Sequence, residues 1–379
     1  MVGGAGMYSV VPANSADFLA SRQAWNALVD RMRYPCVFCG WDWVATWWEH
    51  FGSGRALCPL LIYRDGELKG VLPLFSQRRL AGREARVGRV LGYCAATDLH
   101  PDPLDVVSAE ADADACADAA LAYLRRSRDW DVLHLQFLTG DGHLVRSMGA
   151  ARAYSAHTEQ VSEAPYIPIK GNYDDYLGRL SANERSHIRR RRRRLIEEEG
   201  AAYTDFRSHD AQEVLQTLFE LHERRAAEKR IHSSFARPDV LAFHRDLLIR
   251  LDRSRVWLRG LCRGPEIIAV FYGYVAGGRI SYYQTGHAPL WGEFSPGSVL
   301  LQETIREAFD AGMAEYNFLQ GEEEFKYRWS EHVRPLYAVD LFNGSLCGRL
   351  SRSMAAAKRL LKPVKRAATA TSADTPCVR

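Results

Sequence analysis

The same order of strand-like and helix-like segments occurs twice along this chain of 379 residues. In the first half, two strand-like runs surround an Asp65-Gly66 turn, and an alanine-rich helix over about 111–127 leads into the strand "DVLHLQFL". In the second half, the strands of "VWLRGLCRGPEIIAVFYGYVAG" and "RISYYQTG" precede a helix over about 297–311 and the strand "AEYNFL". The closing segments "LHLQFLTG" and "EYNFLQG" have a similar ending, and the two halves are offset by roughly 180 to 200 residues. This pattern predicts an internal duplication of one α/β unit.

The duplication predicts an α/β (α+β) fold with two mixed-sheet units in tandem. We place the N-terminal unit at 1–165 and the C-terminal unit at 166–345, with a helical insertion at about 172–250. Residues 346–379 are rich in small and basic side chains, which predicts a short helix followed by a partly disordered tail.

The charge of the chain argues against a dedicated DNA-binding protein. The formal net charge is only +4, and much of the excess lies in the arginine run Arg189–Arg194 and in the C-terminal tail. A nucleic-acid-binding domain usually carries a larger basic excess on one face. We therefore expect a small-molecule substrate and no DNA partner, and the oligomeric state is left open.

Eight cysteines are scattered along the chain, and two of them, Cys36 and Cys39, form a C-x-x-C. Such a pair could belong to a metal or redox site. No second C-x-x-C follows at zinc spacing, and Val37 and Phe38 between the two cysteines look like core residues. Reduced core cysteines and no metal are the favoured interpretation, which is typical of a cytosolic protein.

The hydrophobic segments are those of a globular protein with a full core. Hydrophobic residues make up 47% of the chain and charged residues 25%. The N-terminus has no basic region followed by a long apolar stretch, and no window of 18 apolar residues occurs. We therefore expect no signal peptide, no transmembrane segment and a cytoplasmic location.

The segment "SANERSHIRRRRRRLIEEEG", residues 181–200, contains six consecutive arginines. Ser181 and Glu184 fit a capping box and Gly200 is a natural stop, so the segment predicts one helix of about 18 residues. The last arginines precede the glutamates by four residues, which is pairing distance on a regular α-helix. The run is either the exposed face of this helix or a surface that holds RNA.

The segment "FSPGSVLLQETI" has the form of a phosphate-binding helix start. Free backbone N–H groups and the helix dipole converge where a Gly-containing turn enters a helix. Ser295, Gly297 and Ser298 could hold a phosphate there, and Tyr283 on the preceding strand completes this cofactor-binding set. The alternative is an ordinary helix cap, with Ser295 at the cap and Pro296 at the first helical position.

Four segments carry a resemblance to a known family: "RSHIRRRRRRLIEEEG", "EIIAVFYGYV", "SYYQTGHAPLWGEFSPGSVLLQETIREAFDAGMAEYNFLQG" and "EEFKYRW". They resemble the tandem-domain GNAT acyltransferases of the CelD-like group, which is associated with cellulose and exopolysaccharide biosynthesis and related to the FemABX aminoacyl transferases. The resemblance covers most of 57–343 and is most specific over 266–329. It implies two GNAT-like units and acetyl-CoA, or another acyl-CoA, as co-substrate. The chain departs from the family at Asn317, where Asp is frequent, and at His287, where an acidic residue is frequent.

Three residues are candidates for catalysis. Lys326 follows Phe325 as in the Phe-Lys pair that lies near the acyl-transfer site of FemABX-like proteins, and it could hold a carbonyl or phosphate oxygen. His287 follows a strand that should face the cleft, and its ordinary pKa suits a general base. Glu324 is an alternative base. For each of them the alternative interpretation is a solvated side chain.

Candidates to contact the acceptor come from both halves. Gln320, Tyr327 and Trp329 follow the last strand of the second half, and the aromatic rings could form an apolar wall or simply pack in the core. Asp98 and His100 stand in a Pro-bounded loop of the first half and could contact a substrate at the interface between the two units. The simpler interpretation is an ordinary turn rich in Asp and Pro. Since the first half lacks a Ser-Pro-Gly and a Lys-aromatic segment, we expect the second half to be catalytic.

These features lead to one principal hypothesis and two alternatives. The principal one is an acyl-CoA-dependent N-acyltransferase, expected to be an N-acetyltransferase acting on a small amine. The resemblance alone implies that the amine is an amino sugar or a precursor of the cell envelope or exopolysaccharide. One alternative is a FemABX-like transferase that uses aminoacyl-tRNA, and the other is a non-catalytic GNAT-fold scaffold in polysaccharide synthesis.

Overall fold

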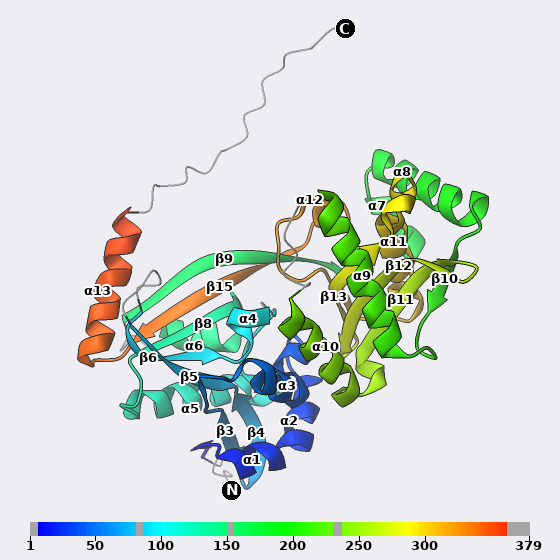
Figure 1. The fold of residues 1–379 in the computed structure, drawn as a ribbon. Helices are drawn as coiled ribbons and strands as arrows, with labels where there is room; N and C mark the ends of the chain where they lie inside the picture. The colour runs from blue at the N-terminus through cyan, green and yellow to red at the C-terminus, as the bar shows by residue number, and fades with distance from the viewer. Residues whose placement is uncertain (1–6, 81–85, 100, 151–154, 230–236, 362–379) are drawn as a thin grey trace, which may run out of the picture.

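The computed structural model shows two α/β units connected by a pair of long strands (Figure 1). It describes residues 7–80, 86–99, 101–150, 155–229 and 237–361. Helix α13 (Leu346–Leu361) follows the second unit and lies at the edge of the molecule (Figure 1).

The first unit follows the order strand, helices, antiparallel strands, helix, strand, helix, strand. Its elements are β1 (Ser9–Pro12), α1 (Ser15–Ala20), α2 (Arg22–Val29), α3 (Trp41–Phe51), β3 (Leu60–Arg64), β4 (Glu67–Leu72), β7 (Val107–Ser108), α5 (Glu110–Arg126), β8 (Val132–Thr139), α6 (His143–Ala150) and β9 (Ser155–Pro168). Four further elements extend its sheet or cover it: β2 (Ala56–Leu57), β5 (Leu74–Arg79), β6 (Gly88–Tyr93) and α4 (Ala96–Leu99). The predicted hairpin turn is present, with Asp65 and Gly66 both at positive φ, which is the backbone that a two-residue turn requires.

The second unit repeats this order, so the predicted duplication is confirmed. Its elements are β10 (Ala202–Asp205), α9 (Ala211–Lys229), α10 (Pro238–Arg250), β11 (Val256–Arg263), β12 (Glu266–Ala276), β13 (Arg279–His287), α11 (Pro296–Asp310), β14 (Glu315–Asn317), α12 (Glu324–Tyr327) and β15 (Val333–Phe342). Before it come α7 (Tyr173–Arg179) and α8 (Ala182–Arg192). In its described residues, the segment 172–250, predicted as helical, contains the α-helices α7, α8, α9 and α10, a π-helical continuation of α8 and also the edge strand β10.

The last strand of each unit pairs with the other unit. β15 pairs antiparallel with β8 of the first unit, and the Tyr166–Pro168 end of β9 pairs antiparallel with β14 of the second. β9 and β15 also pair with each other along their length, and Figure 1 shows them as two long neighbouring ribbons between the units. Eleven of the described strands thereby form one sheet across both units, in the order β10-β11-β12-β13-β14-β9-β15-β8-β6-β5-β2, and the other four form a separate sheet of the first unit, in the order β1-β3-β4-β7. The boundary predicted between residues 165 and 166 falls inside β9.

An aromatic cluster fixes the two units against each other. Phe38 and Trp43 of the first unit each place their rings 5.7 Å from Tyr274 of β12, in edge-to-face contact. The Trp43 ring also lies 4.9 Å from Phe243 of α10. All four side chains are fully buried. Because these rings belong to one hydrophobic core, the units form one packed body.

A buried ion pair between β14 and β15 contacts two tyrosines of the first unit. Arg334 of β15 donates two hydrogen bonds to Glu315 of β14, at 2.9 and 3.2 Å, and both side chains are less than 10% exposed. The guanidinium carbon lies 4.2 Å from the ring centre of Tyr34 and 4.3 Å from that of Tyr166, so the group is stacked between two aromatic faces. Arg279 provides a second partner for Glu315, at 3.0 Å.

Replacing Arg334 with methionine is expected to lower the free energy of unfolding by about 3 kcal/mol, because Glu315 stays buried with only Arg279 as a partner. Urea denaturation followed by tryptophan fluorescence measures the change. The double variant Arg334→Met, Glu315→Gln should lose less than Arg334→Met alone, since it removes the uncompensated carboxylate. A loss below about 1 kcal/mol for Arg334→Met would contradict a structural role for this pair.

Cys36 and Cys39, the two cysteines of the C-x-x-C segment, are buried free thiols. The Sγ atoms of Cys36 and Cys39 lie 3.4 Å apart, and burial raises the pKa of Cys36 well above its usual value. Within the described parts of the chain, no group of three potential ligand side chains is arranged to hold a metal ion. None of the helices there is long and apolar enough to cross a bilayer.

Candidate functional site

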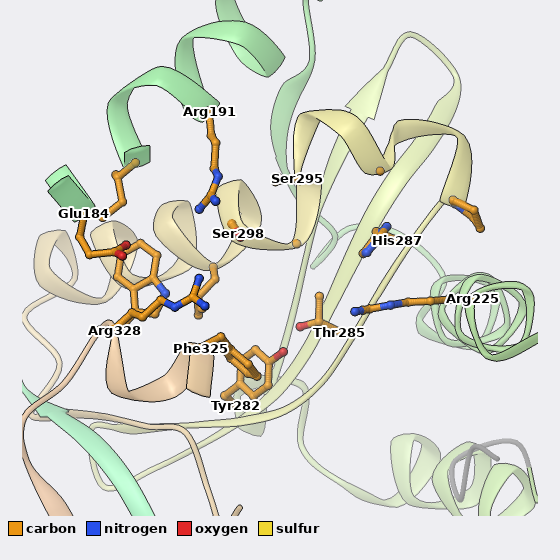
Figure 2. A pocket seen from close by; sticks show the side chains of 16 residues that line it. Glu184, Arg191, Arg225, Tyr282, Thr285, His287, Ser295, Ser298, Phe325 and Arg328 are labelled. Carbon is orange, nitrogen blue, oxygen red and sulfur yellow. The ribbon is translucent and has the colours of Figure 1, made fainter. Parts of the chain in front are cut away.

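A cavity opens where β13 and β14 separate. The two strands pair in parallel only over Arg279–Ser281 and Glu315–Asn317, after which β13 continues to His287 without β14 beside it. The cavity has a volume of about 560 Å³, within the range of small-molecule sites. Figure 2 shows side chains from β13, α8, α9 and the segment around α12 pointing toward the start of α11. It is lined by Glu184, Ile188, Arg191, Arg225, Tyr282, Thr285, His287, Pro289, Gly292, Ser295, Gly297, Ser298, Leu301, Phe325, Arg328 and Trp329.

A bulge in β13 decides which of its side chains reach the cavity. The register against β12 shifts between Tyr272 and Gly273, where Tyr283 is the extra residue on β13. Tyr282 therefore faces the cavity, whereas the Tyr283 ring packs 5.0 Å from His244 in the aromatic cluster on the other face of the sheet. Tyr283, which was predicted to belong to the cofactor-binding set, therefore does not line this cavity, whereas its neighbour Tyr282 does.

The predicted phosphate-binding helix start is part of the cavity wall. Ser295 has the left-handed backbone conformation (φ 53°) and accepts the N–H groups of Ser298 and Val299 through its carbonyl, while its side chain makes no capping hydrogen bond. Pro296 has no N–H to satisfy. Among the described residues, no acceptor takes the N–H of Gly297. The helix start formed by Ser295, Gly297 and Ser298 therefore has room and a backbone N–H for an anion, which is compatible with the predicted phosphate site.

Three arginines lie around this helix start, and only Arg191 belongs to a segment that the sequence marked as notable. Arg191 comes from α8, Arg225 from α9 and Arg328 from the end of α12 (Figure 2). In the described parts of the chain, neither Arg191 nor Arg225 forms an ion pair, and Arg328 reaches only the exposed Glu324, at 3.7 Å. One carboxylate, Glu184, also lines the cavity. The site therefore carries an excess of positive charge beside a helix N-terminus, which suits a phosphate-bearing ligand.

Helix α8 is held over the cavity by a buried ion pair. Arg192 donates to Glu303 of α11 at 2.9 Å, and the Glu303 side chain is fully buried. This contact turns the preceding residue, Arg191, toward the cavity. Ser181 caps α8 by accepting the N–H of Glu184, which is one half of the predicted capping box.

The second part of the arginine segment is not a regular α-helix. Residues Arg193–Glu198 form a π-helix, in which hydrogen bonds connect residues five apart. The ion pairs accordingly join Arg192 to Glu197 and Arg193 to Glu198, five residues apart rather than the four that we expected. Arg194 instead packs its guanidinium 4.9 Å from the ring centre of Phe294. Because a π-helix has more residues per turn than an α-helix, residues five apart lie side by side and form the ion pairs.

His287 is the sequence-predicted base that does line the cavity. Its Nδ1 lies 3.3 Å from the carbonyl oxygen of Ala288. When Nδ1 donates its proton to that oxygen, Nε2 keeps a lone pair that can accept a proton from a substrate. The ring stands close to the start of α11, since a Cβ added to Gly297 would lie 3.5 Å from His287 Cδ2. The role of His287 as a base stays a prediction, which its position in the cavity lining allows.

Lys326 and Glu324 lie away from the cavity lining. Lys326 is 3% exposed, and its Nζ donates to the carbonyl oxygens of Gln320 (2.6 Å) and Leu319 (3.3 Å) and pairs with Glu323 (2.9 Å). All three of its donors therefore have partners in the loop that leaves β14. Glu324 points outward, with 92% of its side chain exposed. Neither Lys326 nor Glu324 belongs to the cavity lining, and their catalytic roles stay predictions.

The other sequence candidates have separate local roles. Trp329 lines the cavity and is 6% exposed. The Tyr327 hydroxyl donates to Glu163 of β9 instead of a ligand, and the Gln320 N–H donates to the carboxylate of Asp102. Asp98 forms a salt bridge with Arg55 and accepts the indole N–H of Trp47 at 2.9 Å. His100 lies outside the described residues.

The equivalent helix start in the first unit is closed to anions. The first turn of α5 carries the acidic residues Glu110 and Asp112. His143 fills the adjacent space, with Nε2 3.1 Å from Glu110 and Nδ1 2.7 Å from Asp114. Carboxylates of the protein itself therefore occupy the positive end of this helix and would repel a phosphate. This contrast supports our expectation that the second half is the catalytic one.

Asp102 lies between the units and makes stability depend on pH. Burial raises its pKa to about 7, although the N–H of Gln320 and the nearby Lys326 and Arg334 oppose the shift. Within the described residues its Oδ1 has no hydrogen-bond partner. The folded protein thus holds a proton that the unfolded chain releases near pH 4, so this group favours folding below pH 4 and the benefit is lost as the pH rises to 7.

Replacing Asp102 with asparagine is expected to remove the decrease in unfolding free energy that this carboxyl group causes between pH 4 and 7. Between pH 5 and 6.5, the unfolding free energy of the variant should fall less steeply, by up to roughly 1.4 kcal/mol per pH unit. Urea denaturation at several pH values measures the two slopes. Asp118→Asn, which changes an exposed aspartate on α5, is the control and should leave the slope unchanged. Parallel profiles for Asp102→Asn and the unmodified protein would contradict the prediction.

Comparison with known proteins identifies the domain that holds the cavity. Residues 182–327 match the family described as an acetyltransferase (GNAT) domain. This segment contains every residue of the cavity lining except Arg328 and Trp329. Among curated proteins, none matches the chain.

The fold is similar to that of several solved structures. FemX superimposes with a TM-score of 0.61 at 11% identity, over 87% of this chain and 96% of that chain. A conserved protein of unknown function from Bacteroides thetaiotaomicron gives 0.55 at 11% identity, over 88% and 100% of the two chains. The C-terminal domain of a putative lysylphosphatidylglycerol synthetase from Agrobacterium fabrum gives 0.52 at 12% identity, over 90% and 97%. At these identities the likeness concerns the fold alone, in which the matched GNAT domain belongs to the second of two mixed-sheet units.

Proposed function

We propose that this chain is an acyltransferase that takes its acyl group from acetyl-CoA or another acyl-CoA and transfers it to a small amine. The observation that carries the proposal is the open N-terminus of α11 inside an arginine-lined cavity of the GNAT domain. Following the sequence resemblance, the acceptor would be an amino sugar or another precursor of the cell envelope or exopolysaccharide.

The cavity offers complementary contacts to the parts of such a donor. The N–H of Gly297 and the guanidinium groups of Arg191 and Arg225 would hold phosphate groups. The part of β13 beyond Ser281 has no neighbouring β14 residue, so an extended chain with amide groups could pair with this edge as an added strand. Phe325 and Trp329 would form the apolar wall beside the acyl group.

The cavity lining contains two candidate bases for the transfer. As the amine nitrogen bonds to the acyl carbon, the carbon–sulfur bond breaks, the sulfur leaves with the bonding electrons and takes up a proton, and the amine loses a proton. His287 Nε2 would accept that amine proton, provided that Nδ1 donates to Ala288. Glu184, whose carboxylate lines the cavity among the described residues, is a second candidate base that was not predicted from the sequence.

Calorimetric titration with CoA, followed by a thiol-release assay with acetyl-CoA and glucosamine, tests the proposal. Binding of CoA at one site and release of free thiol that depends on the amine are expected. If CoA does not bind, the donor assignment is incorrect. If CoA binds but no amine among amino sugars and amino acids accelerates thiol release, the acceptor class is incorrect.

A second candidate function is transfer from aminoacyl-tRNA. Arg189, Arg190 and Arg193 are exposed on the arginine segment, next to Arg191 in the cavity lining. Such a row could bind an RNA backbone, with an affinity that falls as salt rises. Replacing the three exposed arginines with glutamine should then abolish tRNA binding, whereas an acyl-CoA enzyme should keep its CoA affinity in this variant.

A further inference from the structure

We propose that α13 docks the protein on a lipid surface with acidic headgroups. This inference rests on α13 alone and is independent of the proposed acyl transfer.

An exposed apolar stripe runs along α13. Leu346 is 85% exposed and Leu350 is 50% exposed, and their spacing of four residues places them on the same face of the helix. Met354 and Ala357 continue this face at helical spacing. Adjacent exposed leucines on one helix face are typical of a surface that contacts another molecule.

Basic side chains flank the stripe. Arg349, Arg352, Lys358 and Arg359 are all exposed on α13. In the sequence, Lys362, Lys365 and Arg366 follow, so residues 346–366 contain seven basic residues and no acidic one. Clusters of four to eight Lys and Arg on an amphipathic helix are typical of binding to acidic lipids.

The opposite face of α13 is attached to the first unit, which fixes the direction of the stripe. Ser351 is fully buried, and its Oγ accepts the N–H of Val87 at 2.9 Å. Ala355 packs on a small cluster formed by Val90, Val132 and Phe342. Because this face is covered by the protein, the leucine stripe points away from it. Figure 1 shows α13 on the side of the molecule opposite to α8 and α11, so docking would leave the cavity accessible.

The combination of features favours a lipid surface over other partners. An amphipathic helix inserts its apolar face at the boundary of headgroups and acyl chains, while its cations meet the lipid phosphates. RNA would need the cations but would gain nothing from Leu346 and Leu350. A second copy of this chain would bring two helices of the same positive charge together, which is unfavourable. An acidic bilayer satisfies both the stripe and the charges.

Vesicle flotation with the full-length protein tests the proposal. Vesicles of phosphatidylcholine with about one third phosphatidylglycerol should bind the protein, vesicles of phosphatidylcholine alone should bind at least tenfold less, and 0.5 M salt should weaken the binding. Two variants separate the contributions. Leu346→Ser with Leu350→Ser should lower the partition coefficient about tenfold or more, and so should Arg352→Gln with Lys358→Gln.

The control is Leu19→Ser, which removes an exposed leucine on α1, 64% exposed, and should bind as the unmodified protein does. Circular dichroism and the unfolding midpoint verify that each variant is folded. Equal binding to neutral and acidic vesicles, or unchanged binding of both double variants, would overturn the proposal. So would absence of vesicle binding together with tRNA binding that persists without the two leucines, which would assign α13 to RNA instead.

Discussion

Ser298→Asp is expected to weaken CoA binding at least 100-fold while the protein stays as stable as before. Ser298 is the third residue of α11, so a carboxylate there interacts favourably with the helix dipole and preserves the fold. The same carboxylate would lie beside the site proposed for the phosphates. Two like charges about 4 Å apart near a protein surface repel by roughly 4 kcal/mol, which exceeds the gain from the dipole. Calorimetry with CoA and urea denaturation measure the two effects.

The matched control is Ser298→Asn, which is polar and of similar size but carries no charge. It should bind CoA within a few-fold of the unmodified protein. If Ser298→Asp retained full affinity for CoA, the phosphates would have to lie elsewhere, and the central observation behind the proposed function would be lost.

His287→Gln is expected to lower kcat about 100-fold and to leave the affinity for CoA nearly unchanged, because it removes the proposed proton acceptor without altering the charge of the neutral ring. The acidic limb of the pH profile of kcat should disappear in the variant, provided that no other group titrates there. Steady-state thiol release from pH 5.5 to 8.5 measures both quantities.

Glu184→Gln distinguishes the two candidate bases. If it removes the acidic limb while His287→Gln retains it, then Glu184 is the base. A variant of His287 with unchanged kcat would exclude the histidine from the proton transfer.

Local signals in the sequence were sufficient to find the repeated unit and the start of α11. The Asp65-Gly66 pair adopts the positive φ angles that a two-residue hairpin turn requires, and Pro296 stands at the first helical position, where Pro is expected. The helix over about 111–127 appears as α5, Glu110–Arg126. Residues that are close in the sequence determine these elements, so they can be predicted from the sequence alone.

β9 and β15, the strands by which each unit pairs with the other, were not predicted, and their sequences explain why. β9 reads "SAHTEQVSEAPYIP" and is largely exposed on both faces through its first half, so it lacks the alternation of apolar and polar residues that marks a half-buried strand. β15 contains Pro335 and the buried charges of Arg334 and Asp340. Partners more than 150 residues away stabilise both strands, and such pairings leave no local pattern.

The cavity was only partly predictable for a similar reason. Arg191 and Arg225 lie about 70 to 110 residues before Gly297 in the sequence, and only the packing of α8 and α9 brings them to it. Tyr283 was assigned to the cavity because a bulge in β13 is invisible without the register of β12. Lys326 was a plausible catalytic residue by type, but its hydrogen bonds to two carbonyl oxygens depend on the path of a loop.

The strand exchange also has a consequence for how the chain folds during its synthesis. A ribosome releases the N-terminal unit first, yet β8 of that unit lacks its neighbour until β15 has been made, almost 200 residues later. Until then β8 presents an unpaired edge, which is a surface prone to aggregation. The first half of the molecule can therefore reach its final form only after nearly the whole chain has emerged.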